Sequence, residues 1–146
     1  MIRVPQEAHD AVIAHCRRAY PKEACGILAG AASPPAGQAG DVAAVYPMAN
    51  VEDSPIGYAM DPKEQLPLER QMREKGQRLL GIYHSHTASD AYPSPVDVRL
   101  AISPEISYVL VSLKEQTKPV FKSYRIDHGA VEPEDAVIED GPCGQV

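Results

Sequence analysis

The sequence has few cysteines, and no two of them are paired by spacing. Cys16, Cys25 and Cys143 stand at unrelated intervals, and no Cys-x-x-Cys pair occurs. These thiols predict neither a disulfide framework nor a thiolate zinc site. Reduced thiols favour a cytoplasmic protein. Cys16 lies on the apolar face of a predicted helix and Cys25 begins an apolar run, so we expect both to be buried packing residues.

Long hydrophobic runs and basic clusters are also missing. No stretch approaches the ~20 apolar residues of a membrane span, and no apolar signal region stands at the N-terminus. The net charge of −6 makes nucleic acid and anionic membrane surfaces poor partners. The 146 residues are 44% hydrophobic and 23% charged, which is ordinary for one globular domain with one core.

Hydrophobic periodicity and turn residues predict one α/β domain over residues 1–139 and a flexible tail over 140–146. The glycine- and proline-rich segment 31–41 is expected to be a flexible loop. The expected helices cover 5–18, 61–76 and 94–101. The expected strands cover 25–30, 42–46, 78–86, 106–113, 119–126 and 130–138.

The second helix has clear signals at both ends. We expect Asp61 to cap it, Pro62 to occupy its first position, and Glu64 to complete a capping box. Gly76 ends the helix. Pro67 removes an internal hydrogen bond, but it lies early enough in the helix to be tolerated.

Two histidines end the predicted strand 78–86. His84 and His86 are separated by one residue, so their side chains point to the same face of a strand. Asp97 follows closely enough to supply a third ligand, with Asp90 as a rival. Three protein ligands with a fourth position left for water are typical of catalytic zinc, whereas structural sites close that position with protein.

Asp97 also has a structural interpretation. Ser94-Pro95-Val96-Asp97 is a helix start, with Ser94 as the cap and Asp97 near the free amides. The two interpretations are compatible in part, because a helix start fixes where Asp97 points. A carboxylate turned toward zinc is nevertheless not expected to fold back fully onto the amides.

The order of these residues resembles the JAMM (MPN+) metallopeptidases. His84-x-His86, seven residues, Ser94, two residues and Asp97 match the family motif, and Glu23 in Pro21-Lys-Glu-Ala-Cys-Gly matches its early glutamate. The resemblance implies the MPN (JAB1/MPN, cytidine-deaminase-like) α/β sandwich, a curved mixed β-sheet flanked by helices. It further implies one zinc ion per chain, held by His84, His86 and Asp97.

The same resemblance implies roles for the two remaining motif residues. Glu23 would take a proton from water and pass it to the leaving amine. Ser94 would donate a hydrogen bond to the oxyanion of the tetrahedral intermediate.

Further stretches are similar to the Mec-type branch of the family, from about Ile2 to Val137. They include Ser54-Pro55, Tyr58, Thr87 and Tyr108–Ser112. That branch hydrolyses the amide between a ubiquitin-like sulfur carrier ending in Gly-Gly and an attached cysteine, in a route of cysteine biosynthesis. On this basis we expect a pocket for the terminal cysteine near Ser94 and the loop 87–93, with Tyr92 as its test residue.

Three other interpretations stay open at this point. One is a broader JAMM peptidase that trims extensions from sulfur carriers, and another is a metal-free MPN scaffold that only binds partners. A third is a cysteine nucleophile at Cys25 with a histidine as its activator. The sequence also leaves the oligomeric state open, including a homodimer.

Overall fold

The computed structural model describes residues 1–142. Among them the helices are α1 (Gln6–Ala19), α2 (Pro62–Glu74) and α3 (Pro95–Arg99). The strands are β1 (Ile2–Pro5), β2 (Cys25–Ala31), β3 (Ala44–Met48), β4 (Gln77–His86), β5 (Ser107–Ser112), β6 (Val120–Asp127), β7 (Ala130–Glu134) and β8 (Ala136–Glu139). No helix of this part of the chain is long and apolar enough to cross a membrane.

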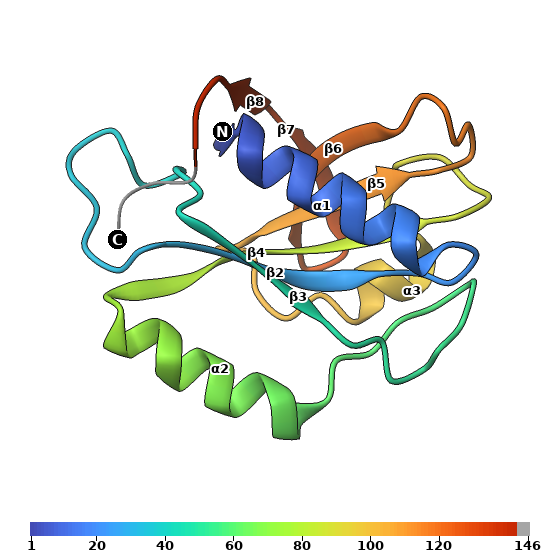
Figure 1. Ribbon diagram of the computed structural model, residues 1–146, viewed down its shortest axis with the longest axis horizontal. Coiled ribbons are helices and arrows are strands. Elements are labelled where there is room, and N and C mark those ends of the chain that lie inside the picture. Colours follow the sequence, from blue (N-terminus) through green and yellow to red (C-terminus); the bar gives the residue numbers. More distant parts are fainter. Residues whose placement is uncertain (143–146) are drawn as a thin grey trace.

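The main sheet is mixed and runs in the order β3-β2-β4-β5-β6-β7. β4 and β5 are parallel, and the other neighbouring pairs are antiparallel. Figure 1 shows α1 on one side of this sheet and α2 on the other. β4 therefore lies in the middle of a covered sheet, which explains its long buried sequence.

Each face of the sheet has its own core. The α1 side buries a continuous set of aliphatic side chains, including Val12, Cys16, Leu28, Val109 and Val111. On the opposite side Met72 of α2 packs with Ile27, and Ile82 packs with Ile126 farther along the sheet. Two covered faces make the α/β sandwich that the sequence predicts.

Most predicted elements are present, with shifted ends. The third strand begins at Ala44 rather than at 42, and α3 spans Pro95–Arg99 with Ser94 as its cap. Cys16 and Cys25 are buried free thiols, as predicted. Cys143 lies outside the described residues. Within the predicted tail, Gly141 accepts a backbone hydrogen bond from Glu7 at 3.3 Å.

The prediction of one edge strand over 130–138 is wrong. The chain forms β7 on the main sheet and then β8, which pairs in parallel with β1. Ile2 donates to the Asp135 carbonyl at 2.9 Å where the chain changes sheets. The signal for β1 was the alternation around Ile2 and Val4, both fully buried.

The predicted ends of α2 are confirmed at Asp61 and Gly76 but not at Glu64. The Asp61 side chain accepts a hydrogen bond from the Lys63 N–H at 2.9 Å, and Gly76 has a φ of +70° just after the helix. The predicted capping box is wrong, because Glu64 Oε1 accepts from the Ala49 N–H at 3.3 Å instead. Ala49 follows β3, so the carboxylate binds an amide that the strand end leaves available.

Candidate metal centre

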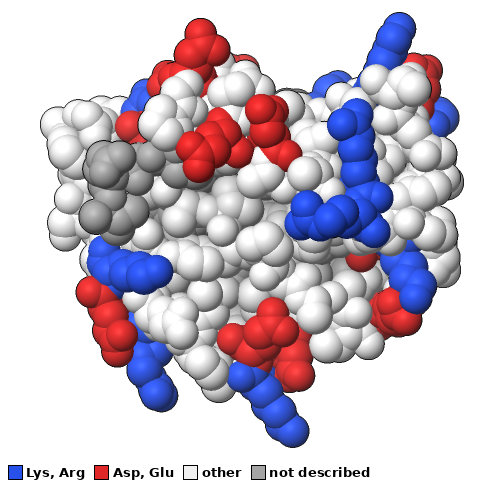
Figure 2. Space-filling model, viewed as in Figure 1, with Lys and Arg blue, Asp and Glu red and all other residues white. Residues whose placement is uncertain are grey.

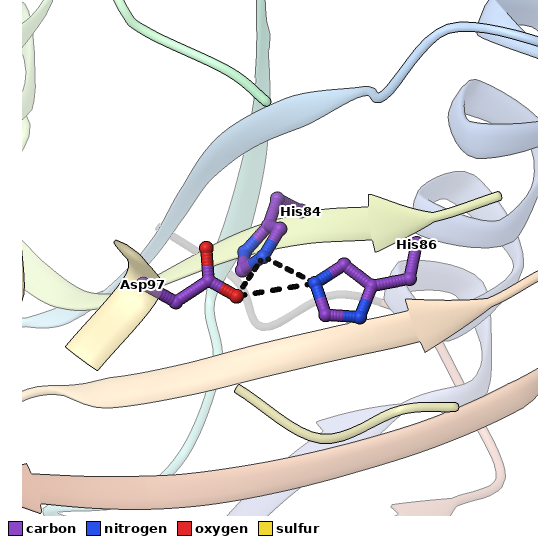
Figure 3. Close-up of side chains that lie close together, drawn as sticks. All are labelled: His84, His86 and Asp97. Carbon is purple, nitrogen blue, oxygen red and sulfur yellow. Dashed lines mark hydrogen bonds and ion pairs between the residues drawn. The ribbon is translucent and has the colours of Figure 1, made fainter. Parts of the chain in front are cut away.

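His84 and His86 project from the end of β4 toward Asp97 on α3 (Figure 3). Their Nε2 atoms lie 3.2 Å apart, and each is 3.1 Å from Asp97 Oδ2. Both histidines are buried, with only 3% and 6% of their surface exposed. The strand spacing and the start of α3 therefore bring the predicted residues to one point.

The donor set fits a small divalent metal. Zinc bonds of about 2.0–2.1 Å in a tetrahedron place donor atoms about 3.3–3.4 Å apart. The observed triangle of two imidazole nitrogens and one carboxylate oxygen is close to that size. Nitrogen and oxygen donors suit zinc, and three protein ligands leave one tetrahedral position open.

Asp97 Oδ2 serves the histidines and the helix start at once. It accepts a hydrogen bond from the Ser94 N–H at 2.8 Å, while Ser94 Oγ accepts from the Asp97 N–H at 3.1 Å. The two roles are compatible, since Asp97 Oδ2 faces both the Ser94 amide and the two imidazoles. The capping box fixes the rotamer of the carboxylate and thereby directs it at His84 and His86.

Burial and contacts set the charges of the three side chains. Burial works against ionisation of Asp97, but contacts with His84 and His86 outweigh it and hold the pKa of that carboxyl well below its usual range. Burial lowers the pKa of His84, which favours the neutral imidazole that binds metals. Burial also disfavours a charge on His86, but its contacts with Asp97 and the Asp90 carbonyl outweigh this and raise its pKa.

Glu23 lies beside the histidines because β2 and β4 are antiparallel. Ser85 donates to the Ala24 carbonyl at 3.0 Å, which aligns Glu23, just before β2, with the end of β4. The residue is 6% exposed. Burial raises the pKa of Glu23 to about 7, and the negative charge of Asp97 acts in the same direction. A carboxyl group with this pKa can take up and release a proton near neutral pH.

Asn50 fixes the backbone of Glu23, and sequence reasoning missed it. Its Nδ2 donates to the Glu23 carbonyl at 3.0 Å and to the Gly57 carbonyl at 2.9 Å. Its Oδ1 accepts from the amides of Glu52 and Ala59 at 3.1 and 3.0 Å. A side-chain amide that crosses a loop in this way leaves no periodic signal in the sequence.

An apolar cleft of about 250 Å³ leads to the candidate centre. Ser94 and Asp97 lie on its wall, and Tyr58 stacks on the His84 ring with centroids 4.5 Å apart. Burial raises the pKa of Tyr58, so this ring carries a neutral hydroxyl. Tyr92 lines a different cavity, between the loop 87–93 and β5–β6. Ser94 and Tyr92 therefore do not line the same cavity, and the pocket for the terminal cysteine stays a prediction.

Asp90 and Cys25 have other roles than those weighed from the sequence. The Asp90 carboxylate is exposed and lies 3.4 Å from Lys114 Nζ, while its carbonyl contacts His86 Nδ1 at 2.9 Å. Cys25 is fully buried, and burial raises the pKa of its thiol to about 12. A thiol held in this neutral form is a poor nucleophile.

The fold and this cluster define a JAB-type metalloprotease-like domain, and the chain belongs to the family of prokaryotic homologues of the JAB domain, which matches residues 5–127. The match confirms the predicted JAB1/MPN fold. Among its relatives is the CysO-cysteine peptidase of Mycobacterium tuberculosis, 46% identical over 125 residues, covering 86% of this chain and 82% of that protein.

Two further similarities extend the comparison. The desampylase of Haloferax volcanii is 33% identical over 111 residues, covering 73% of this chain and 76% of that protein. A solution structure of a Desulfitobacterium hafniense protein superimposes with a TM-score of 0.84 at 40% identity, covering 97% and 94% of the two chains. The likeness therefore extends over nearly the whole domain.

Proposed function

We propose that this chain is a zinc-dependent hydrolase of the JAMM type. It cleaves the amide between the C-terminal glycine of a ubiquitin-like sulfur carrier and an attached cysteine, and it releases L-cysteine. The observation that carries the proposal is the triangle of His84, His86 and Asp97 donor atoms beside the buried Glu23. The similarity to the Mycobacterium tuberculosis peptidase over most of both chains supports the substrate.

A zinc ion, when bound by these three residues, supplies Lewis acidity that polarises the scissile carbonyl and makes water more acidic. Glu23 takes the proton of the attacking water and hands it to the amine of the departing cysteine. Its burial beside the three ligands suits a carboxyl that exchanges protons with groups bound there. Asn50 and the antiparallel β2–β4 pair hold Glu23 in place for this work.

Ser94 stabilises the charge that develops on the carbonyl oxygen. Its Oγ accepts from the Asp97 N–H, which leaves the hydroxyl hydrogen free to donate toward the substrate. Because Ser94 lies on the wall of the cleft, a group bound there is within its neighbourhood. A donor of this kind typically contributes about 10²–10³ in rate.

The cleft supplies a path for the carrier tail. It is lined mainly by apolar residues from segments 56–60 and 94–102, and its wall includes Ser94 and Asp97. An extended Gly-Gly end has no side chains, so it fits a narrow channel that a bulkier tail would not enter. The carrier is therefore proposed to bind with its C-terminus in this cleft.

A broader peptidase that trims ubiquitin-like conjugates is the second candidate. The similarity to the Haloferax volcanii desampylase favours it. The two candidates differ in their tolerance of the residue after the carrier glycine, because the broader enzyme accepts residues other than cysteine.

We also propose the cytoplasm as the place of action, since Cys16 and Cys25 occur as buried free thiols. The catalytic domain is proposed to comprise residues 1–139. The homodimer and the flexible tail stay predictions.

The test is the intact mass of a Gly-Gly-ended carrier bearing a C-terminal cysteine. We expect the zinc-loaded protein to remove one cysteine residue, chelator-stripped protein to leave the mass unchanged, and Glu23→Gln to act about 10²–10⁴-fold more slowly with its zinc content retained. Carriers ending in alanine or serine serve as specificity controls. Equal cleavage of all three carriers favours the trimming peptidase, and a wild-type chain that binds no zinc contradicts the proposal.

A further inference from the structure

The loop 87–93 contributes a backbone atom to the candidate centre. His86 Nδ1 lies 2.9 Å from the Asp90 carbonyl oxygen. A carbonyl oxygen only accepts, so Nδ1 carries the hydrogen and donates it, and the Nε2 lone pair faces Asp97 and His84. The position of one peptide group therefore decides both the tautomer and the direction of the ring.

That peptide group lies in a segment without helix or strand structure. The Asp90 carbonyl also accepts from the Tyr92 N–H at 2.8 Å, so the loop turns tightly at this point. Loops of this kind are the mobile parts of a fold unless other elements anchor them. A metal ligand oriented by such a loop needs a support from the sheet.

Two buried hydroxyl groups provide the support on either side of Asp90. Ser112 Oγ donates to the Ser89 carbonyl at 2.6 Å, and Tyr124 OH donates to the Ala91 carbonyl. Ser112 ends β5 opposite His86 in the β4–β5 register, and Tyr124 belongs to β6. Their side chains come from neighbouring strands and are only 4% and 5% exposed.

We infer that Ser112 and Tyr124 are positioning residues that fix the Asp90 carbonyl and thereby orient His86 for metal binding. The two hydroxyls hold the carbonyls that immediately precede and follow Asp90, so the peptide group between them has little freedom to rotate. Groups that orient a histidine ligand in this way typically contribute 10–100-fold to metal affinity when they contact the ligand directly. This inference rests on the proposed metal site and not on the identity of the substrate.

The test is zinc affinity measured by competition with a chelator. We expect Tyr124→Phe and Ser112→Ala each to bind zinc several-fold more weakly than the wild-type chain, an effect below the about 10–100-fold of groups that contact a ligand directly. Tyr46→Phe and Ser123→Ala are matched controls. Tyr46 OH donates to Gln77 Oε1 at 2.6 Å and Ser123 Oγ donates to Glu134 at 2.7 Å. Each control variant therefore loses one hydroxyl hydrogen bond that involves neither His86 nor the loop 87–93.

Two further measurements separate orientation from folding. The metal-free form of Tyr124→Phe is expected to melt as the metal-free Tyr46→Phe protein does, and the visible spectrum of the cobalt-loaded protein is expected to change only in the two positioning variants. Zinc affinities equal to those of the controls overturn the inference while leaving the proposed function intact. A wild-type chain that binds no zinc overturns both. Ser112→Ala decides the matter alone if Tyr124→Phe does not fold.

Discussion

Ser94 has two roles that a single substitution would confuse. Its Oγ caps α3 by accepting from the Asp97 N–H, and its hydroxyl hydrogen is available to a substrate. Removal of the cap alone would weaken α3 and displace Asp97. A test of the catalytic role therefore needs two variants that lack the hydroxyl and differ in their effect on the helix.

We expect Ser94→Ala and Ser94→Gly to slow hydrolysis equally, by about 10²–10³-fold. Their stabilities should differ, because alanine at a cap costs about 1 kcal/mol and glycine only a few tenths. Rate assays with the carrier–cysteine conjugate and thermal melts check both expectations. If the less stable variant is also the slower one, Ser94 has a structural role only.

At the scale of the element, a bulge in β4 decides which face the histidines occupy. Leu79 pairs with Ala29 and Gly81 pairs with Leu28, which leaves Leu80 without a partner on β2. Leu80 packs in the α1-side core, whereas Ile82 packs on the opposite side. Residues two apart share a face in a regular strand, so the bulge reverses the alternation before His84.

Close packing between β2 and β4 gives a prediction for Gly26. A Cβ atom at this position would overlap the Tyr83 ring, whose hydroxyl is held by His15 Nδ1 at 2.6 Å. We expect Gly26→Ala to destabilise the protein by about 1–3 kcal/mol, seen as a lower melting temperature. Gly30→Ala is the matched control, because its Cβ comes only within 3.1 Å of the Asp41 carbonyl oxygen. Equal losses in both variants would contradict the clash.

The sequence predicts elements and motif residues better than it predicts what joins them. Alternation and motif spacing located β4, and the His84, His86 and Asp97 ligand atoms do lie within 4.8 Å of one another. The bulge at Leu80 escaped prediction because an inserted residue is defined only relative to its partner strand. Asn50 escaped because its partners lie on segments that meet only after folding.

At the scale of the whole molecule, Glu134 connects the end of β7 to β6 and to the N-terminus. Its oxygens accept from Ser123 and Arg125 at 2.7 Å each, and the Met1 ammonium lies 3.5 Å away. Burial by itself raises the pKa of Glu134, but polar contacts with Ser107, Ser123 and Arg125 outweigh it and lower the pKa. A carboxyl whose pKa is lower in the folded than in the unfolded state stabilises the fold at pH values above the unfolded-state pKa.

We expect the wild-type chain to melt at a higher temperature than Glu134→Gln at neutral pH. The difference should shrink as the pH falls below the ordinary glutamate value of about 4.3 and through the lower folded value, where both chains carry a neutral side chain. Melting curves between about pH 3 and 7 measure this. Glu132→Gln, at an exposed position on the same strand, is the matched control for the substitution itself. A gap that stays constant with pH would contradict the assignment.

Exposed apolar residues border the cleft that contains Ser94 and Asp97. Acidic and basic side chains are interspersed over the face shown in Figure 2, rather than gathered by sign. Large exposed apolar residues instead surround the cleft that contains Ser94 and Asp97. They are Ile56, Val96, Leu100 and Ile102. On the proposed function, this rim contacts the body of the carrier while its tail lies in the cleft.

We therefore expect Leu100→Ser to raise KM for the carrier–cysteine conjugate several-fold while kcat and zinc affinity stay unchanged, because the rim binds substrate and transition state alike. Leu66→Ser is the matched control, since Leu66 on α2 is 64% exposed and Leu100 is 62% exposed, and Leu66 is not part of the cleft wall. Steady-state kinetics on the intact conjugate and on a short peptide ending in Gly-Gly-Cys separate contact with the carrier body at the rim from contact with the tail in the cleft. If Leu100→Ser raises KM for the peptide as much as for the conjugate, the Leu100 side chain contacts the tail, and the carrier body binds elsewhere.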